Sequence, residues 1–145
     1  MNISQAARQS GLSAKQIRDY EKSGLITPPP RGSNGYRSYR EEDVARLRFI
    51  FQARQVGFSL ADIQSLLALS DNPGRSSRAV KLLTGQHIDR LRGEIAKMQA
   101  MLALLEGWYD ACAGDQNPAC PILNGLNRPC ALRAEGDGDM YSHLK

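Results

Sequence analysis

The chain has 145 residues, 41% of them hydrophobic, which is enough for a modest core in one domain or two small ones. Its formal charge of +4 at pH 7 is unevenly distributed. Residues 1–60 carry ten Lys or Arg against five Asp or Glu, whereas residues 61–145 carry nine against ten. A basic first half suits a polyanionic partner such as DNA.

The sequence also excludes some classes of protein. The first residues, MNISQAARQSGLS, are polar where a signal peptide has a continuous apolar segment, and no apolar run is long enough to span a bilayer. We therefore expect a cytoplasmic protein with no membrane partner. The cysteines, Cys112, Cys120 and Cys130, are odd in number, which in a reducing compartment favours metal ligation or thiol chemistry over a disulfide framework.

The chain begins with the pattern of two short helices joined by a turn. Apolar residues at helical spacing predict a helix over residues 3–10, capped by Asn2 or Ser4. Gly11 interrupts the pattern, and Ser13 stands at the N-cap of a second helix that is ended by a glycine at position 24. This is the outline of a helix-turn-helix, although short helix pairs also occur in many other folds.

Residues 25–39, LITPPPRGSNGYRSY, differ in character from the helices before them. Three consecutive prolines exclude a helix, and Asn34-Gly35 is typical of a two-residue hairpin turn with positive φ. The segment is therefore predicted to form a small β-ribbon, or wing.

Two more helices are expected after the wing. The first covers residues 41–56, begins with three acidic residues that complement the helix dipole, and is stopped by Gly57. Ser59 caps the next, over residues 60–69, and the composition of residues 70–74 predicts a loop. The fold class is thus mainly α, with a winged helix-turn-helix domain over residues 1–70.

The longest predicted helix covers residues 76–112. Its apolar residues alternate at spacings of three and four, the heptad pattern of a coiled coil: Ile88, Leu91, Ile95, Met98, Leu102 and Leu105. At 1.5 Å per residue this helix is about 50 Å long, too long for the small preceding domain to cover. We expect a parallel or antiparallel two-chain coiled coil that makes the protein a homodimer. The alternative is that these side chains pack inside one subunit.

The two thiols of CAGDQNPAC follow this helix. Seven residues separate Cys112 from Cys120, and their Gly, Asp, Asn and Pro can fold the chain back so that both sulfurs meet. The loop holds no histidine and no third cysteine, whereas a structural zinc site normally has four N or S ligands. Two thiolates suit a soft ion of low coordination number, which means Cu(I), Ag(I) or Au(I), one per loop.

The remaining candidate ligands and the chain end carry less information. Cys130, His87 and His143 are the available third ligands; Cys130 lies in a weakly constrained tail, and both histidines are expected in solvent or on a helix surface. Residues 112–127 comprise the metal-binding loop and a short helical turn that begins at a proline. A flexible tail is expected over residues 128–145, which have little to bury.

Arginine and tyrosine residues gather on the second helix, the wing and the third helix. Guanidinium and phenol groups suit phosphate oxygens because Arg offers a planar fork of donors and Tyr a directed hydroxyl. The candidates are Arg18, Tyr20, Tyr36, Arg37 and Arg54. Lys15 and Gln16, in the first turn of the second helix, are best placed to reach base edges in a major groove. Tyr20 equally fits a core position, and Arg54 equally fits a solvated charge or an ion pair.

Several strings of the sequence resemble one family. The strings ISQAARQSGLSAKQIRDYEKSGLI, NGYRSY and VARLRFIFQARQVGFSLADI resemble the N-terminal half of the MerR family of transcription regulators. The string CAGDQNPACPI is similar to the metal-binding loop of its copper-, silver- and gold-responsive members, so the resemblance covers residues 1 to about 126. It implies that the five Arg and Tyr candidates hold the DNA backbone and that the dimerisation helices run antiparallel.

The resemblance also implies an explanation of metal valence. In the family, the residue at the position of Ser77 reaches the metal loop of the other subunit, and divalent-metal sensors carry cysteine there. Two thiolates and a monovalent ion leave one negative charge, which the Ser77 hydroxyl and the helix N–H groups would stabilise; a plain N-cap role is the alternative. Ala113 and Pro118 match the gold-responsive members, which favours Au(I) as inducer through loop shape and outer hydrogen bonds.

The mechanism implied by the resemblance is DNA distortion. The dimer binds a palindromic operator in a promoter whose spacer is too long for RNA polymerase, and metal changes the angle between the DNA-binding domains. Bends of this kind cost on the order of 1 to 6 kcal/mol, so metal would select between DNA-bound states. RNA polymerase is then affected only through the shared promoter.

Two alternatives compete with metal sensing. In the first, a regulator of the same fold uses a reversible Cys112–Cys120 disulfide as a redox switch. In the second, the chain is an enzyme such as a thiol oxidoreductase or a zinc hydrolase. The sequence has no CxxC, no paired carboxylates near a histidine and no Gly-rich phosphate loop, so we expect that it is not an enzyme.

Overall fold

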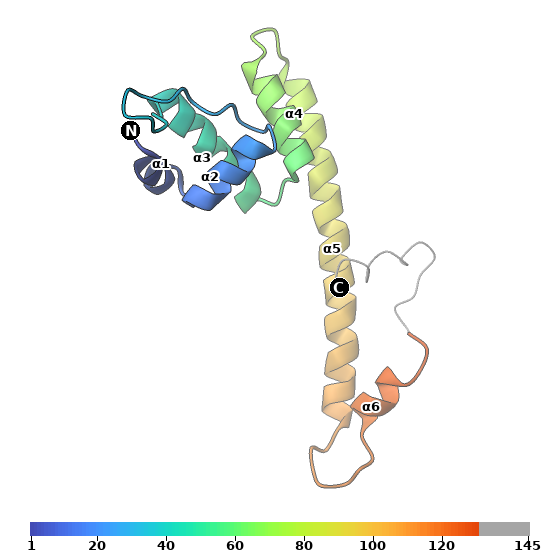
Figure 1. The fold of residues 1–145 in the computed structure, drawn as a ribbon. Helices are drawn as coiled ribbons and strands as arrows, with labels where there is room; N and C mark the ends of the chain where they lie inside the picture. Colours follow the sequence, from blue (N-terminus) through green and yellow to red (C-terminus); the bar gives the residue numbers. More distant parts are fainter. Residues whose placement is uncertain (131–145) are drawn as a thin grey trace. The chain divides into compact units, whose positions relative to one another are not determined.

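The computed structural model describes residues 1–130, which contain helices and one hairpin but no strand (Figure 1). The helices are α1 (Ile3–Ser10), α2 (Ala14–Lys22), α3 (Glu41–Gln55), α4 (Leu60–Asp71), α5 (Ser77–Ala111) and α6 (Pro121–Leu126). Every helix expected from the sequence is present, with ends that differ from the prediction by at most two residues. The mainly α fold class is confirmed.

The chain divides into two compact units. The first, Met1–His87, contains α1 to α4, the hairpin and the beginning of α5. The second begins at Ile88 and contains the rest of α5, the loop that follows it and α6. No helix among residues 1–130 is long and apolar enough to cross a membrane.

The core of the first unit is formed by one apolar face of each of its helices. Ile17, Ile50 and Ile63, from α2, α3 and α4, are completely buried. Burying a side chain of this size contributes roughly 1.5 to 3 kcal/mol. The buried apolar residues are Ala6, Leu12, Ile17, Ile26, Tyr39, Val44, Leu47, Ile50, Ala53, Phe58, Ile63, Leu66 and Leu67. This core holds the first two helices and the hairpin in fixed positions.

Side-chain caps set the beginnings of α1 and α2. Asn2 Oδ1 accepts a hydrogen bond from the Gln5 backbone N–H at 2.9 Å, and Gln5 Oε1 accepts one from the Asn2 N–H at 2.9 Å. Ser13 and Gln16 form the same reciprocal capping box at 3.1 and 2.9 Å. Between the helices, Gly11 has φ +90°, a conformation that favours glycine. The expected caps at positions 2 and 13 are confirmed.

The hairpin differs from the prediction of a two-residue turn. The Gly32 N–H donates to the Tyr36 carbonyl at 2.6 Å, and the Gly35 N–H donates to the Gly32 carbonyl at 3.0 Å. Gly35 has φ +80°, whereas Asn34, like every other described non-glycine residue, avoids positive φ. Its carboxamide oxygen instead accepts the Tyr36 N–H at 3.1 Å. The result is a three-residue loop with positive φ at its last position.

The predicted β-ribbon is also shorter than expected. Within the described residues its ladder consists of one antiparallel bridge between Arg31 and Arg37. The prolines at positions 28–30 have no N–H to donate, so beyond the bridge only the Ser38 N–H bonds across, to the Pro30 carbonyl at 3.3 Å. The wing is held mainly by the Arg37–Glu21 ion pair to α2 and by backbone hydrogen bonds between Tyr39 and Met1.

His87 corrects another expectation, because it is buried and not at a helix surface. Its side chain is on α5, and its Nε2 lies 2.7 Å from the Val56 carbonyl oxygen. Its ring lies against that of Phe58, with the centroids 4.5 Å apart. Carbonyl groups at a helix C-terminus have no N–H donor within the helix, and His87 forms a hydrogen bond with one such carbonyl at the end of α3. His87 is thus part of the packing of the first unit, while His143 lies outside the described residues.

The second unit exposes its apolar heptad residues. In this single chain, the six heptad side chains from Ile88 to Leu105 are between 36% and 64% exposed. No residue between positions 88 and 130 is buried. The alternative in which these side chains pack inside one subunit is therefore not what the described residues form.

Candidate functional site

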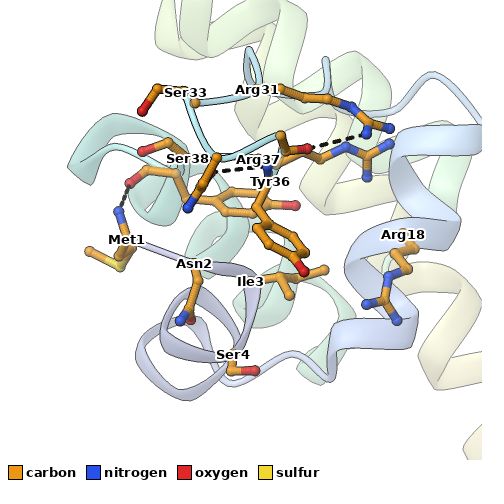
Figure 2. A pocket seen from close by; sticks show the side chains of 14 residues that line it. Met1, Asn2, Ile3, Ser4, Arg18, Arg31, Ser33, Tyr36, Arg37 and Ser38 are labelled. Carbon is orange, nitrogen blue, oxygen red and sulfur yellow. Dashed lines mark hydrogen bonds between the residues drawn. The ribbon is translucent and has the colours of Figure 1, made fainter.

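The first part of the candidate site is a basic hollow in the first unit. The start of α1, Arg18 of α2 and the wing line a cavity with a volume of about 730 Å³. Figure 2 shows Arg18 on α2 facing Tyr36, Arg31 and Arg37 of the wing. An adjoining hollow of about 340 Å³ has four cationic residues in its lining, against one carboxylate. These are Arg18, Lys22, Arg31, Arg37 and Glu21. Such a surface attracts a polyanion.

A buried carboxylate holds the wing against α2. The Glu21 side chain is only 2% exposed, and its carboxylate forms an ion pair with Arg37, whose Nη1 donates the hydrogen bond. The Tyr39 hydroxyl donates to its other oxygen at 2.6 Å. Burial of Tyr39, and then its hydrogen bond to the Glu21 carboxylate, raises the pKa of this phenol to about 12. Tyr39 therefore stays protonated and keeps its hydrogen bond at neutral pH.

Sequence reasoning missed both Glu21 and Tyr39. The available signal was spacing, because position 21 is one helical turn after the fully buried Ile17 and lies on the same face of α2. A carboxylate on an inward face needs a buried partner. The nearby GYRSY string contains both partners, Arg37 and Tyr39.

Of the candidate DNA contacts, Arg18, Tyr36 and Arg37 line the hollow, whereas Lys15, Gln16, Tyr20 and Arg54 are outside its lining. Lys15, Gln16 and Arg18 are exposed on α2, and Tyr36 is 73% exposed at the hairpin. The Gln16 carboxamide oxygen already accepts a hydrogen bond in the capping box, so its amide N–H groups are the donors that remain for a ligand. These exposed groups are accessible to a ligand without rearrangement of the core.

The other three candidates are tied to the protein. Arg37 is half-buried and paired with the carboxylate beneath it. Tyr20 was expected either to contact DNA or to occupy a core position. It is half-buried and packs against the core. Arg54 is exposed, and its Nη1 donates to the Phe58 carbonyl at 3.2 Å, which leaves its other donors for a ligand. Their positions are fixed before any ligand binds.

The second part of the candidate site is the thiol loop of the second unit. Cys112 directly follows α5 and Cys120 directly precedes α6, and both are half-buried. Interaction with the backbone of Leu123, and then with the backbone of Ile122 and the Cys112 side chain, lowers the pKa of the Cys120 thiol, although burial acts in the opposite direction. The two thiols thus stand at the two ends of one loop and close enough for one to affect the pKa of the other.

Two local turns shape this loop. Asp115 Oδ1 accepts the Asn117 N–H at 2.9 Å, and Asn117 Oδ1 accepts the Ala119 N–H at 3.0 Å. Gly114 has φ +67° and turns the chain after α5. Ala113 precedes Gly114 and the first turn, Pro118 is the central residue of the second turn, and both side chains are exposed. Their position fits an effect on loop shape.

The sequence also singled out Ser77, as a residue near the metal, and Cys130, as an available third ligand. Ser77 is exposed and is the first residue of α5, so the N-cap position falls to Ser76. Cys130 is exposed at the end of the described chain. Among residues 1–130, no three His, Cys, Asp or Glu side chains are grouped so that they could hold a metal ion.

Comparison with known proteins assigns a family. Residues 1–70 match the MerR HTH family regulatory proteins, and residues 44–108 match the region described as MerR, DNA binding. A probable heavy metal-dependent transcriptional regulator of Haemophilus influenzae is 58% identical over 127 residues, which are 88% of this chain and 99% of that protein. The HTH-type transcriptional regulator CueR of Salmonella typhi is 39% identical over 93% of this chain and 98% of its own.

A solved structure agrees with these relatives. The transcription regulator PbrR691 from Ralstonia metallidurans CH34, in complex with Lead(II), superposes with a TM-score of 0.75. The two chains are 29% identical, and the match covers 87% of this chain and 98% of that one. All three relatives are transcription regulators, which confirms both the resemblance seen in the sequence and the expectation that the chain is not an enzyme. The chain belongs to the MerR family of helix-turn-helix transcription regulators.

Proposed function

We propose that this chain is a transcription activator that binds a palindromic promoter operator as a homodimer and responds to Cu(I), Ag(I) or Au(I). The observation that carries the proposal is the placement of Cys112 and Cys120, both half-buried, at the two ends of one loop, while no group of three His, Cys, Asp or Glu side chains able to hold a metal exists among residues 1–130. A similar regulator in Haemophilus influenzae is described as probably heavy metal-dependent, and relatives at about 40% identity are CueR proteins.

The donor set fits a monovalent soft ion. Thiolates prefer soft metals, and two of them satisfy an ion of low coordination number, whereas zinc normally takes four ligands in a structural site. The backbone of Leu123 and Ile122, which lowers the pKa of the Cys120 thiol, would also offset the residual negative charge of two thiolates around a monovalent ion. When bound, the ion supplies a cross-link between the end of α5 and the beginning of α6.

Ser77, Ala113 and Pro118 would tune this site without coordinating the ion. The Ser77 hydroxyl, exposed at the start of α5, would face the metal loop of the other subunit in the dimer. Ala113, before the first local turn, and Pro118, within the second, would set the shape of the loop, and we propose Au(I) as a preferred inducer on this ground.

The basic hollow would bind the operator. Arg18, Tyr36, Arg37 and Arg54, with Tyr20 beside them, would contact phosphates, while Lys15 and Gln16 would reach base edges. Dimerisation through the exposed heptad side chains of α5 would place two such hollows on the two half-sites of a palindrome. Antiparallel pairing of the α5 helices is proposed from the family resemblance.

Metal would act by selecting between two DNA-bound states. A metal-dependent change in the angle between the DNA-binding units would bend and untwist the operator, at a cost on the order of 1 to 6 kcal/mol. RNA polymerase would respond to the altered promoter and would need no contact with the regulator. Because promoter DNA is the target, we propose a cytoplasmic location.

X-ray absorption on the dimer loaded with Cu(I) or Au(I) tests the proposal. We expect two sulfur neighbours in near-linear geometry, and their loss in Cys112→Ser and Cys120→Ser. Additional nitrogen or oxygen neighbours would contradict the assignment of Ser77 as a non-coordinating residue. Cys130→Ser is the matched control and should leave both the spectrum and promoter activation unchanged.

The proximity of the two thiols favours a disulfide switch equally, so the experiment must separate the two functions. Promoter activity is measured with Cu(I) under anaerobic, reducing conditions and, in parallel, with a metal-free oxidant. Activation by Cu(I) alone supports metal sensing. Activation by the oxidant, with a Cys112–Cys120 disulfide found by mass spectrometry, would instead establish the redox alternative.

A further inference from the structure

α6 is held on α5 by an unusually close contact. A helix of six residues is not stable alone in water and depends on packing. Figure 1 shows α6 beside the last turns of α5. A Cβ added at Gly125 would overlap Trp108 Cε2 and lie 2.5 Å from Trp108 Nε1, so no side chain fits there without movement. The backbone of α6 therefore lies directly against the indole ring.

This contact is adjacent to both thiols. Trp108 precedes Cys112 by one helical turn and lies on the same face of α5. Gly125 belongs to α6, the helix that begins right after Cys120. Because α6 is so short, a shift of α6 relative to the indole also moves the Cys120 sulfur relative to the end of α5.

We propose that Trp108 and Gly125 position the metal site, by fixing α6 on α5 and thereby setting the separation of the Cys112 and Cys120 sulfurs. Trp108 acts through this contact and does not itself bind the ion. The inference rests on the proposed function, because separation matters most for an ion held by two thiolates. Because residues 1–130 group no third ligand with the two thiols, a displaced sulfur would lower affinity directly.

The separation of the thiols is measurable without metal. In full-length protein carrying Cys130→Ser, the two thiols react with oxidised glutathione to give one protein disulfide and two molecules of reduced glutathione. The equilibrium gives the effective concentration of one thiol at the other, and Gly125→Ala should lower it about tenfold. Gly107→Ala is the matched control, because its added Cβ would meet nothing within 4 Å. It should leave the equilibrium unchanged.

A second substitution separates the contact from helix propensity. Alanine favours helix over glycine, so Gly125→Ala would stabilise an α6 that did not touch Trp108. Trp108→Leu removes the ring atoms that the new methyl group would meet. In the Trp108→Leu background, Gly125→Ala should therefore lose most of its effect on the glutathione equilibrium. Equal effects in both backgrounds would overturn the inference.

Metal affinity gives the final measurement. Competition with a Cu(I) chelator should show about 10- to 100-fold weaker binding in Gly125→Ala, as for other neighbours of metal ligands, while Gly107→Ala binds like wild type. Wild-type values for both the thiol equilibrium and Cu(I) affinity in Gly125→Ala would overturn the inference. Failure of the wild-type protein to bind Cu(I) would instead overturn the proposed function, and the glutathione equilibrium would still decide whether Trp108 and Gly125 set the thiol separation.

Discussion

The two units of the chain place their functional side chains in different ways. In the first unit, Arg37 is anchored to a buried carboxylate above a continuous apolar core. In the second, Cys112 and Cys120 are half-buried beside a six-residue helix, and no residue between positions 88 and 130 is buried. The difference indicates that the first unit buries its apolar side chains within one chain, whereas the second leaves apolar side chains exposed that another apolar surface would have to cover. A second copy of α5 would supply it.

The largest expected effect tests this need for a partner. Leu102→Glu places a charge in the middle of the heptad residues, where burial of an unpaired charge costs on the order of 3 kcal/mol or more. We expect sedimentation equilibrium to show monomers, with binding to a palindromic operator reduced to that of a half-site. Ala100→Glu adds the same charge on the opposite face of α5 and should leave the dimer intact. A Leu102→Glu protein that stayed dimeric would place the subunit interface elsewhere.

The next largest effect concerns the buried Glu21 network, which stabilises the first unit. Glu21→Gln removes the carboxylate that pairs with Arg37 and accepts from Tyr39, and should lower the free energy of unfolding by about 1 to 3 kcal/mol. Tyr39→Phe removes one hydrogen bond and should cost about 1 kcal/mol. Urea denaturation measures both. Asp19→Asn, at an exposed position of the same helix, is the control, and an equal cost there would mean that the buried network adds little.

A smaller effect concerns DNA affinity. Arg18→Ala should weaken operator binding and reduce the slope of log K against log salt by about 1, because one phosphate contact is lost. The loss should be similar for specific and random DNA. Lys81→Ala removes an exposed charge of α5 that is not in the lining of the hollow, and its slope should equal that of the wild type. Identical slopes for the two variants would exclude Arg18 as a phosphate contact.

The smallest effect is a pH dependence at the surface. Arg46 donates to both oxygens of Asp71 at 3.0 Å, and this hydrogen bonding lowers the pKa of the exposed carboxyl. Because the folded-state pKa is lowered, the stabilisation is present above the ordinary Asp pKa of about 3.9 and is lost as the pH falls through the folded value. Asp71→Asn should therefore be slightly less stable than wild type at neutral pH and equally stable in acid. A difference independent of pH would assign the effect to packing.

The same contrast explains how much was predictable from the sequence. Helices and caps followed from local patterns, since Asn2 and Ser13 act on residues three positions away. The meeting of Cys112 and Cys120 was equally local, because a short loop connects them. Long-range contacts were not predictable in this way. His87 packs on Phe58, and Glu21 is buried under the wing, because tertiary packing decides which polar groups are enclosed.

The hairpin shows a third kind of outcome. Asn34-Gly35 was correctly placed in a turn, but the loop has three residues and Asn34 keeps negative φ. A dipeptide preference cannot distinguish two loop types that share glycine at the same position. The hydrogen bond from the Tyr36 N–H to the Asn34 carboxamide accompanies the longer loop.

The bond network under the wing also has a consequence for the thermodynamics of recognition. Because the Glu21 carboxylate already binds Arg37 and Tyr39 in the DNA-free chain, the wing has given up its conformational entropy during folding. Association with an operator would then order little protein backbone, and its heat-capacity change should match that of two preformed surfaces. The wing would then meet DNA as a rigid body, and any adaptation of shape would fall to the DNA.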